Sequence, residues 1–201
     1  MHEVGIQNPW TLRRDISVAV NFGVWVLEKE GLHVPPFDVH ARGNGFLDRA
    51  GFQKEQWQEW IAHIVNRQEQ FHSALLQSPS QGIVVPPFSS SDPSTSWPGN
   101  ERTRGRLQAL WQQYLPQAGK QKKRVRMLAQ QLQGFDQQLW NDLQVYQTRL
   151  PSLIFYLIEY RQSVIYPVPP HSLVVSLVNG SLEVKDLCRR IGQQVERLAQ
   201  G

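Results

Sequence analysis

Residues 120–150, KQKKRVRMLAQQLQGFDQQLWNDLQVYQTRL, contain the clearest helical pattern in the chain. Seven apolar residues in this stretch follow one another at steps of three or four positions: Leu128, Leu132, Phe135, Leu139, Leu143, Tyr146 and Leu150. Such spacing places all seven side chains on one face of an α-helix. A helix of this length measures about 46 Å, so other segments must cover its apolar face. The sequence therefore predicts a mainly α-helical protein with bundle-like packing around one long helix.

Residues 152–178 leave a second fold class open. Residues 153–160 are the most hydrophobic stretch in the chain, and the proline-rich residues 163–170 that follow are typical of extended backbone. Periodicity alone does not distinguish a buried helix from a central strand in so short a run. The alternative fold class is therefore α+β, with a small C-terminal sheet formed from residues 152–178. In the all-helical arrangement, residues 171–178 and 182–199 form a closing pair of helices.

Three further helices are expected from apolar spacing and from their end signals. The first runs to Glu30, with Thr11 as its N-cap and Gly31 just past its end. The third ends ahead of Pro116, and Gly119 then permits a turn into the long helix. The predicted ranges of the three are 12–30, 52–76 and 103–115.

Residues 78–100 are dense in serine and proline, which is typical of a linker or surface loop. Residues 83–88 are apolar enough to dock back on the fold, and Trp97 is expected to do the same. This stretch predicts an N-terminal helical part over residues 1–77, a linker or loop over 78–104 and a C-terminal helical part over 105–201, or else a single domain.

Composition indicates a folded protein without a membrane span. Apolar residues make up 40% of the 201 positions, and seven Trp and eight Phe can fill a substantial core. No apolar run approaches the roughly 20 residues that cross a bilayer, and the N-terminus lacks the pattern of a signal peptide. The single cysteine, Cys188, cannot form an internal disulfide and is expected to be a buried small hydrophobe beside Leu187 and Ile191. We expect a cytoplasmic protein without a cofactor.

The positive charge is concentrated in one segment. Eight of the 21 Lys and Arg residues lie between positions 102 and 126, where there is no Asp or Glu, so the rest of the chain is net acidic. These are the candidate binding residues: Arg102, Arg104, Arg106, Lys120, Lys122, Lys123, Arg124 and Arg126. Such a layout favours an anionic partner, although an ordinary solvated surface is the simplest alternative.

Cations in the first turns of the expected long helix would oppose its macrodipole, so helix stability does not explain them. We therefore expect a non-catalytic binding or assembly factor that engages an acidic partner protein through this basic helix start. The alternative is a nucleic-acid-binding protein, in which the arginines at 102–106 follow a phosphate backbone while Trp111 and Tyr114 stack on bases. The sequence does not indicate an oligomeric state.

A second alternative is an enzyme with its site on the loop over residues 35–49. Asp38, His40 and Arg42 lie on this glycine-rich loop, where an imidazole oriented by a carboxylate could act as a general acid or base. His33 could join Asp38 and His40 as a metal ligand, but without helix-fixed spacing, so no metal is expected. In the simplest interpretation these side chains only satisfy a tight turn.

The glycine-asparagine-glycine sequence at positions 43–45, followed by Arg49, resembles the loop of Fic-type AMP transferases, whose fold is also helical. That family has its catalytic His where this chain has Asp38, and an Arg where this chain has Phe46. The resemblance therefore implies no such activity here.

Overall fold

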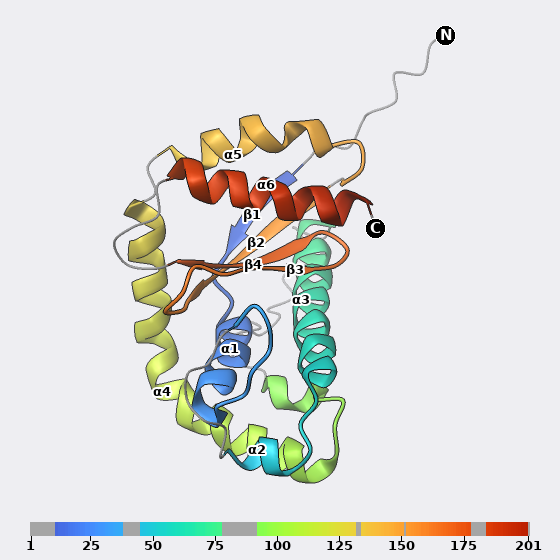
Figure 1. The fold of residues 1–201 in the computed structure, drawn as a ribbon, viewed down its shortest axis with the longest axis vertical. Helices are drawn as coiled ribbons and strands as arrows, with labels where there is room; N and C mark the ends of the chain where they lie inside the picture. Colours follow the sequence, from blue (N-terminus) through green and yellow to red (C-terminus); the bar gives the residue numbers. More distant parts are fainter. Residues whose placement is uncertain are drawn as a thin grey trace.

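A four-stranded mixed sheet lies at the centre of the computed structural model, which describes residues 11–37, 45–77, 92–131, 134–150, 152–177 and 184–200 (Figure 1). The strands are β1 (Thr11–Asp15), β2 (Ser152–Glu159), β3 (Ile165–Val168) and β4 (Ser172–Leu177). Their order across the sheet is β1-β2-β4-β3, so β1 and β3 are the edge strands. β1, β2 and β4 run parallel, and β3 runs antiparallel to β4.

Helices cover both faces of this sheet. They are α1 (Val18–Glu30), α2 (Phe46–Arg49), α3 (Lys54–Gln77), α4 (Glu101–Gln131), α5 (Phe135–Leu143) and α6 (Val184–Gln200), with short 3-10 helices η2 (Pro93–Ser96) and η3 (Gln144–Tyr146). In Figure 1, α5 and α6 lie on one face of the sheet, α1 and α3 lie on the other, and α4 runs along one side.

The helical cover explains why residues 152–159 and 172–177 form strands. All the side chains of residues 153–158 and 172–177 are buried. Strands that are covered on both faces are expected to be apolar throughout, without alternating polar residues. The structure is mainly helical with a small mixed sheet: residues 152–177 supply three of its strands, as the α+β alternative predicts, but the fourth, β1, comes from residues 11–15. The predicted helix over residues 171–178 is wrong, because β4 pairs with both β2 and β3. Its predicted partner is confirmed as α6.

Two hydrophobic cores lie on the two faces of the sheet. The first is rich in aromatic residues from α1, α3 and α4, and its indole N–H groups find acceptors: Trp57 donates to the Gly23 carbonyl at 3.0 Å and Trp60 to the Pro93 carbonyl at 2.8 Å. Trp97 is 2% exposed in this core, which confirms that it docks on the fold. The second core lies between the sheet and α5 and α6.

The predicted helix over residues 120–150 is wrong at both ends. The chain is already helical from Glu101, and α4 continues through Pro116 and Gly119 to Gln131. Gly134, with φ 74°, then separates α4 from α5. A left-handed residue cannot continue a right-handed helix, and glycine adopts it without a steric penalty. The apolar spacing survives this break because Leu128 at the end of α4 and Phe135, Leu139 and Leu143 of α5 all face the second core.

The predicted first helix is two elements. Residues 11–15 form β1, and α1 begins after Ser17, whose side chain accepts a hydrogen bond from the Val20 N–H at 3.1 Å. Ser17 is thus the N-cap, in place of Thr11. Gly31, with φ 68°, ends α1 as predicted. The helix over residues 52–76 is confirmed as α3.

The two parts predicted on either side of a 78–104 linker share one sheet and one core. β1 pairs with β2, and the first core contains side chains from α1, α3 and α4. Residues 78–91 lie outside the described residues, while residues 93–96 form η2 and α4 starts at Glu101. The division itself stays a prediction. No described helix is long and apolar enough to span a membrane.

Cys188 is 1% exposed beside Leu187 and Ile191 in the second core, as predicted. Burial, and then the charge of Asp142, raise the pKa of its thiol to about 11. The thiolate is the reactive form, so alkylation by iodoacetamide should be slow at about pH 7 and faster at about pH 9. Mass spectrometry would measure labelling, with urea-unfolded protein as the control. Equal rates in folded and unfolded protein would contradict this expectation.

Candidate functional site

The carboxyl ends of the three parallel strands meet at one edge of the sheet. β1 ends at Asp15, β2 at Glu159 and β4 at Leu177. Ligands of open sheets covered on both faces bind outside this edge, because loops and helix ends converge there. The C-terminal half of α4 packs along this edge, with one hollow on each side of it. We therefore take this edge as the candidate site.

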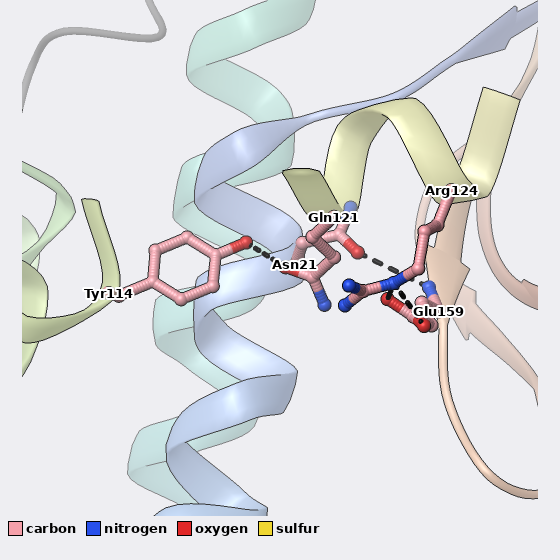
Figure 2. Close-up of polar contacts among 5 residues, drawn as sticks. All are labelled: Asn21, Tyr114, Gln121, Arg124 and Glu159. Carbon is pink, nitrogen blue, oxygen red and sulfur yellow. Dashed lines mark hydrogen bonds and ion pairs between the residues drawn. The ribbon is translucent and has the colours of Figure 1, made fainter. Parts of the chain in front are cut away.

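Asn21 of α1 closes the end of β2 (Figure 2). Its Nδ2 donates to the carbonyl oxygens of Ser17, at 2.9 Å, and Leu157, at 3.2 Å. Its Oδ1 accepts a hydrogen bond from the Glu159 N–H at 3.3 Å. Because β1 has ended at this level, Asn21 supplies the backbone of β2 with the partners that a neighbouring strand would provide. This contact fixes the position of Glu159.

Glu159 in turn holds Arg124 of α4 (Figure 2). The Arg124 Nε lies 2.7 Å from Glu159 Oε1 and 3.0 Å from Oε2. One turn earlier on α4, Gln121 accepts a hydrogen bond from the Tyr114 hydroxyl. Burial, and then the charge of Glu159, raise the pKa of Tyr114, so its hydroxyl remains a donor at neutral pH. The Arg124–Glu159 pair connects α4 to β2 and gives Arg124 an intramolecular partner, whereas the Tyr114–Gln121 hydrogen bond lies within α4.

The hollow on the β4 side of α4 is about 450 Å³ and electrically balanced. Its charged lining residues are Glu28, Glu159, Arg124 and Arg161. Burial raises the pKa of Glu28; the positive charge of Arg161 acts to lower it, and the negative charge of Glu159 adds to the increase. Two carboxylates against two guanidinium groups give this hollow no strong preference for either sign of ligand.

The hollow on the β1 side of α4 is different. It measures about 400 Å³ and is lined by three cations, Arg14 of β1 and Lys122 and Arg126 of α4, against one carboxylate, Asp15. Ile16, Leu157 and Ala129 supply apolar wall. Lys122 and Arg126 are one helical turn apart, so they lie on the same side of α4. Neither forms an ion pair with any residue that the structure describes. We call this the basic hollow.

The eight predicted binding residues do not form one surface. The three at the start of α4 are tied to the scaffold: Arg102 lies 5.0 Å from the centre of the Phe46 ring, Arg104 donates to the Trp97 carbonyl at 3.4 Å, and Arg106 pairs with the buried Glu30 at 2.6 Å. Residues 102 and 122 are about 30 Å apart along the helix. Lys120 and Lys123 are exposed on α4 and do not line the basic hollow.

Two expectations about the basic segment and its neighbouring aromatic residues are wrong. Because α4 begins at Glu101, residues 120–126 lie toward its C-terminal end, where cations do not oppose the macrodipole. Trp111 and Tyr114, expected to stack on bases, are 2% and 1% exposed in the first core.

The loop candidates Asp38, His40 and Arg42 lie outside the described residues, so their role as an enzyme site stays a prediction. Within the described residues, no group of three or more His, Cys, Asp and Glu could hold a metal ion.

The sequence did not indicate Arg14 of β1, Asn21 and Glu28 of α1, or Glu159 of β2, which lies more than 120 positions further along the chain. A charged residue directly after an apolar run, as at Glu159, is the signal that could have indicated a strand end at a site.

The chain matches no protein-family model, no curated protein and no solved structure. Its function is therefore argued from this geometry.

Proposed function

We propose that the protein is a non-catalytic binding protein that engages an acidic segment of a partner protein at the basic hollow. One observation carries the proposal: Arg14, Lys122 and Arg126 converge on a hollow of about 400 Å³ that contains a single carboxylate. Arg14 also pairs with Asp136 of α5 at 2.7 Å, which holds its guanidinium at the rim. Lys122 and Arg126 then supply the charge that a partner carboxylate would neutralise.

The available cations and the apolar lining of the basic hollow favour a protein segment over nucleic acid. A phosphate backbone needs cations spaced along its path, whereas Arg102, Arg104, Arg106 and Arg124 are occupied by contacts within the protein. The walls also include Ile16 and Leu157, which suit an aliphatic neighbour of a carboxylate side chain. The net acidic remainder of the chain would repel an extended polyanion.

The test uses a fluorescein-labelled octapeptide of alternating Glu and Thr, and compares two charge-matched double variants. Lys122→Gln with Arg126→Gln should weaken binding about tenfold, because each partly enclosed charge contact contributes roughly 0.7 kcal/mol. Arg102→Gln with Arg104→Gln removes the same charge from the far end of α4 and should change the affinity less than about twofold. Fluorescence anisotropy measures both.

Equal losses in the two double variants would mean that the peptide responds only to net charge, and the proposal would fail. A labelled DNA duplex provides the second arm. Three phosphate contacts would give a slope of about −2.7 in log K against log salt, a roughly fortyfold loss between about 50 and about 200 mM salt. Duplex binding tighter than peptide binding at the higher salt would support the nucleic-acid alternative.

A further inference from the structure

We propose that the acidic segment binds as an additional β-strand on the free edge of β1. That the bound segment is acidic rests on the proposed function. That it binds as a strand follows from the backbone geometry of the sheet.

The hydrogen-bond pattern of β2 shows which backbone groups of β1 face outward. The Ile154 N–H donates to the His171 carbonyl at 3.1 Å, on the β4 side, whereas the Leu157 carbonyl and the Glu159 N–H meet Asn21, on the β1 side. The backbone N–H and C=O groups of the even-numbered residues of β2 therefore point toward β4, and those of the odd-numbered residues point toward β1.

The register pairs Leu12 with Leu153 and Arg14 with Phe155. In a parallel ladder, Leu153 and Phe155 then bond to the odd-numbered residues of β1. The N–H and C=O groups of Leu12 and Arg14 consequently point away from β2. In the described part of the chain β1 pairs with β2 alone, so these four groups form a template for another strand.

Two hollows line this edge and meet at Arg14. The first, of about 350 Å³, lies between β1 and α5, and its apolar walls are Leu12, Leu139, Phe155 and the 40% exposed Trp140. The second is the basic hollow, beyond Arg14 toward the end of β1. An added strand would thus place apolar side chains near Trp140 and acidic ones near Lys122 and Arg126.

A second copy of this chain fits the edge poorly. Pairing β1 with β1 would bring Arg13 and Arg14 of both copies together, and facing like charges destabilise strand pairs. Charge complementarity therefore selects an acidic extended segment from a different protein.

Backbone methylation separates strand addition from simple charge attraction. We would compare the Glu-Thr octapeptide with two derivatives, one methylated on the backbone nitrogens of the Glu residues and one on those of the Thr residues. Alternate N–H groups of a strand point to opposite sides, so only one set can face β1. That set should lose binding by about tenfold or more, while the other should stay within about threefold. The sensitive set also shows whether the added strand is parallel or antiparallel.

A matched pair of protein variants tests the same contact from the other side. Leu12→Pro removes one outward N–H, while the bonds from β1 to β2 involve residues 11, 13 and 15. Leu12→Ala removes the same packing but keeps the N–H. The Pro variant should bind the octapeptide about tenfold more weakly than the Ala variant, with similar melting temperatures. If Leu12→Pro unfolds the protein, binding of the two methylated peptides to the wild-type protein is the test of strand addition.

Equal effects of the two methylated peptides, or no peptide binding at about 1 mM, would overturn strand addition. Its failure is distinguishable from failure of the proposed function. Binding that responds to Lys122→Gln with Arg126→Gln but not to methylation removes strand addition and leaves the acidic partner. Binding that responds to methylation but not to Lys122→Gln with Arg126→Gln contradicts acid recognition.

Discussion

Replacing Leu139 by Ala should lower the free energy of unfolding by about 2 to 5 kcal/mol, because the buried side chain leaves a cavity in the second core. Leu139 is 0% exposed and packs with Phe135, Leu143 and Leu153 between α5 and the sheet. This loss would be a large part of the roughly 5 to 15 kcal/mol that stabilises a typical domain. Urea unfolding monitored by circular dichroism measures it.

The matched control is Leu115→Ala, which truncates the same type of side chain at a 38% exposed position of α4. Its cost should stay near 0.5 kcal/mol, roughly the limit for surface substitutions. Similar unfolding midpoints for the two variants would mean that Leu139 is not part of a packed core.

Replacing Arg106 by Ala should cost about 3 kcal/mol, because it leaves the buried carboxylate of Glu30 without its charge partner. Glu30 is 2% exposed. Its Oε1 accepts hydrogen bonds from the Arg106 Nε at 3.0 Å and Nη2 at 2.6 Å, and its Oε2 accepts one from the Leu47 N–H at 3.0 Å. The Glu30 carboxylate therefore links α1 to α4 through the ion pair and to α2 through the Leu47 N–H.

Chemical denaturation of Arg106→Ala, Glu30→Leu and the double variant forms a thermodynamic cycle. The double variant should be more stable than Arg106→Ala, because it no longer contains an uncompensated buried charge. Arg102→Ala is the control on the same helix, and loss of its contact with Phe46 should cost less than about 1 kcal/mol. A double variant whose loss equals the sum of the single losses would contradict coupling between Arg106 and Glu30.

The sequence predicted helices well where periodicity and end signals agree, and poorly where a breaker residue had to be judged. Gly31 ends α1 as expected, but Pro116 does not end α4. Proline in a helix interior costs about 3 kcal/mol, yet Tyr114 and Ala118 on either side of it are both buried in the first core. Packing outweighs the local penalty, and Pro116 itself is exposed, so water can reach the carbonyl that it leaves unpaired. The local sequence does not show whether tertiary packing outweighs the cost of a proline within the helix.

The candidate site was harder to predict because it depends on the sheet. Lys122 and Arg126 were identified from charge alone, but Arg14 belonged to an expected helix. β1 has only five residues, two of them arginines, and its partner strand begins at Ser152. Nothing local marks such a strand, because its pairing and its covering helices determine its structure. The division of the eight cations into scaffold and surface groups also depends on tertiary contacts such as Arg106 with Glu30.

The pairing of β1 with β2 also affects how the chain can fold during synthesis. Asn21 and Leu157, which meet at the end of β2, are 136 positions apart. A chain still emerging from the ribosome has β1 and α1 outside long before β2 exists, so neither the sheet nor its free edge can form until translation has passed Glu159. Contacts of such long sequence separation also slow folding. A protein truncated before β2 would consequently lose the ordered free edge of β1 even though Leu12 and Arg14 are still present.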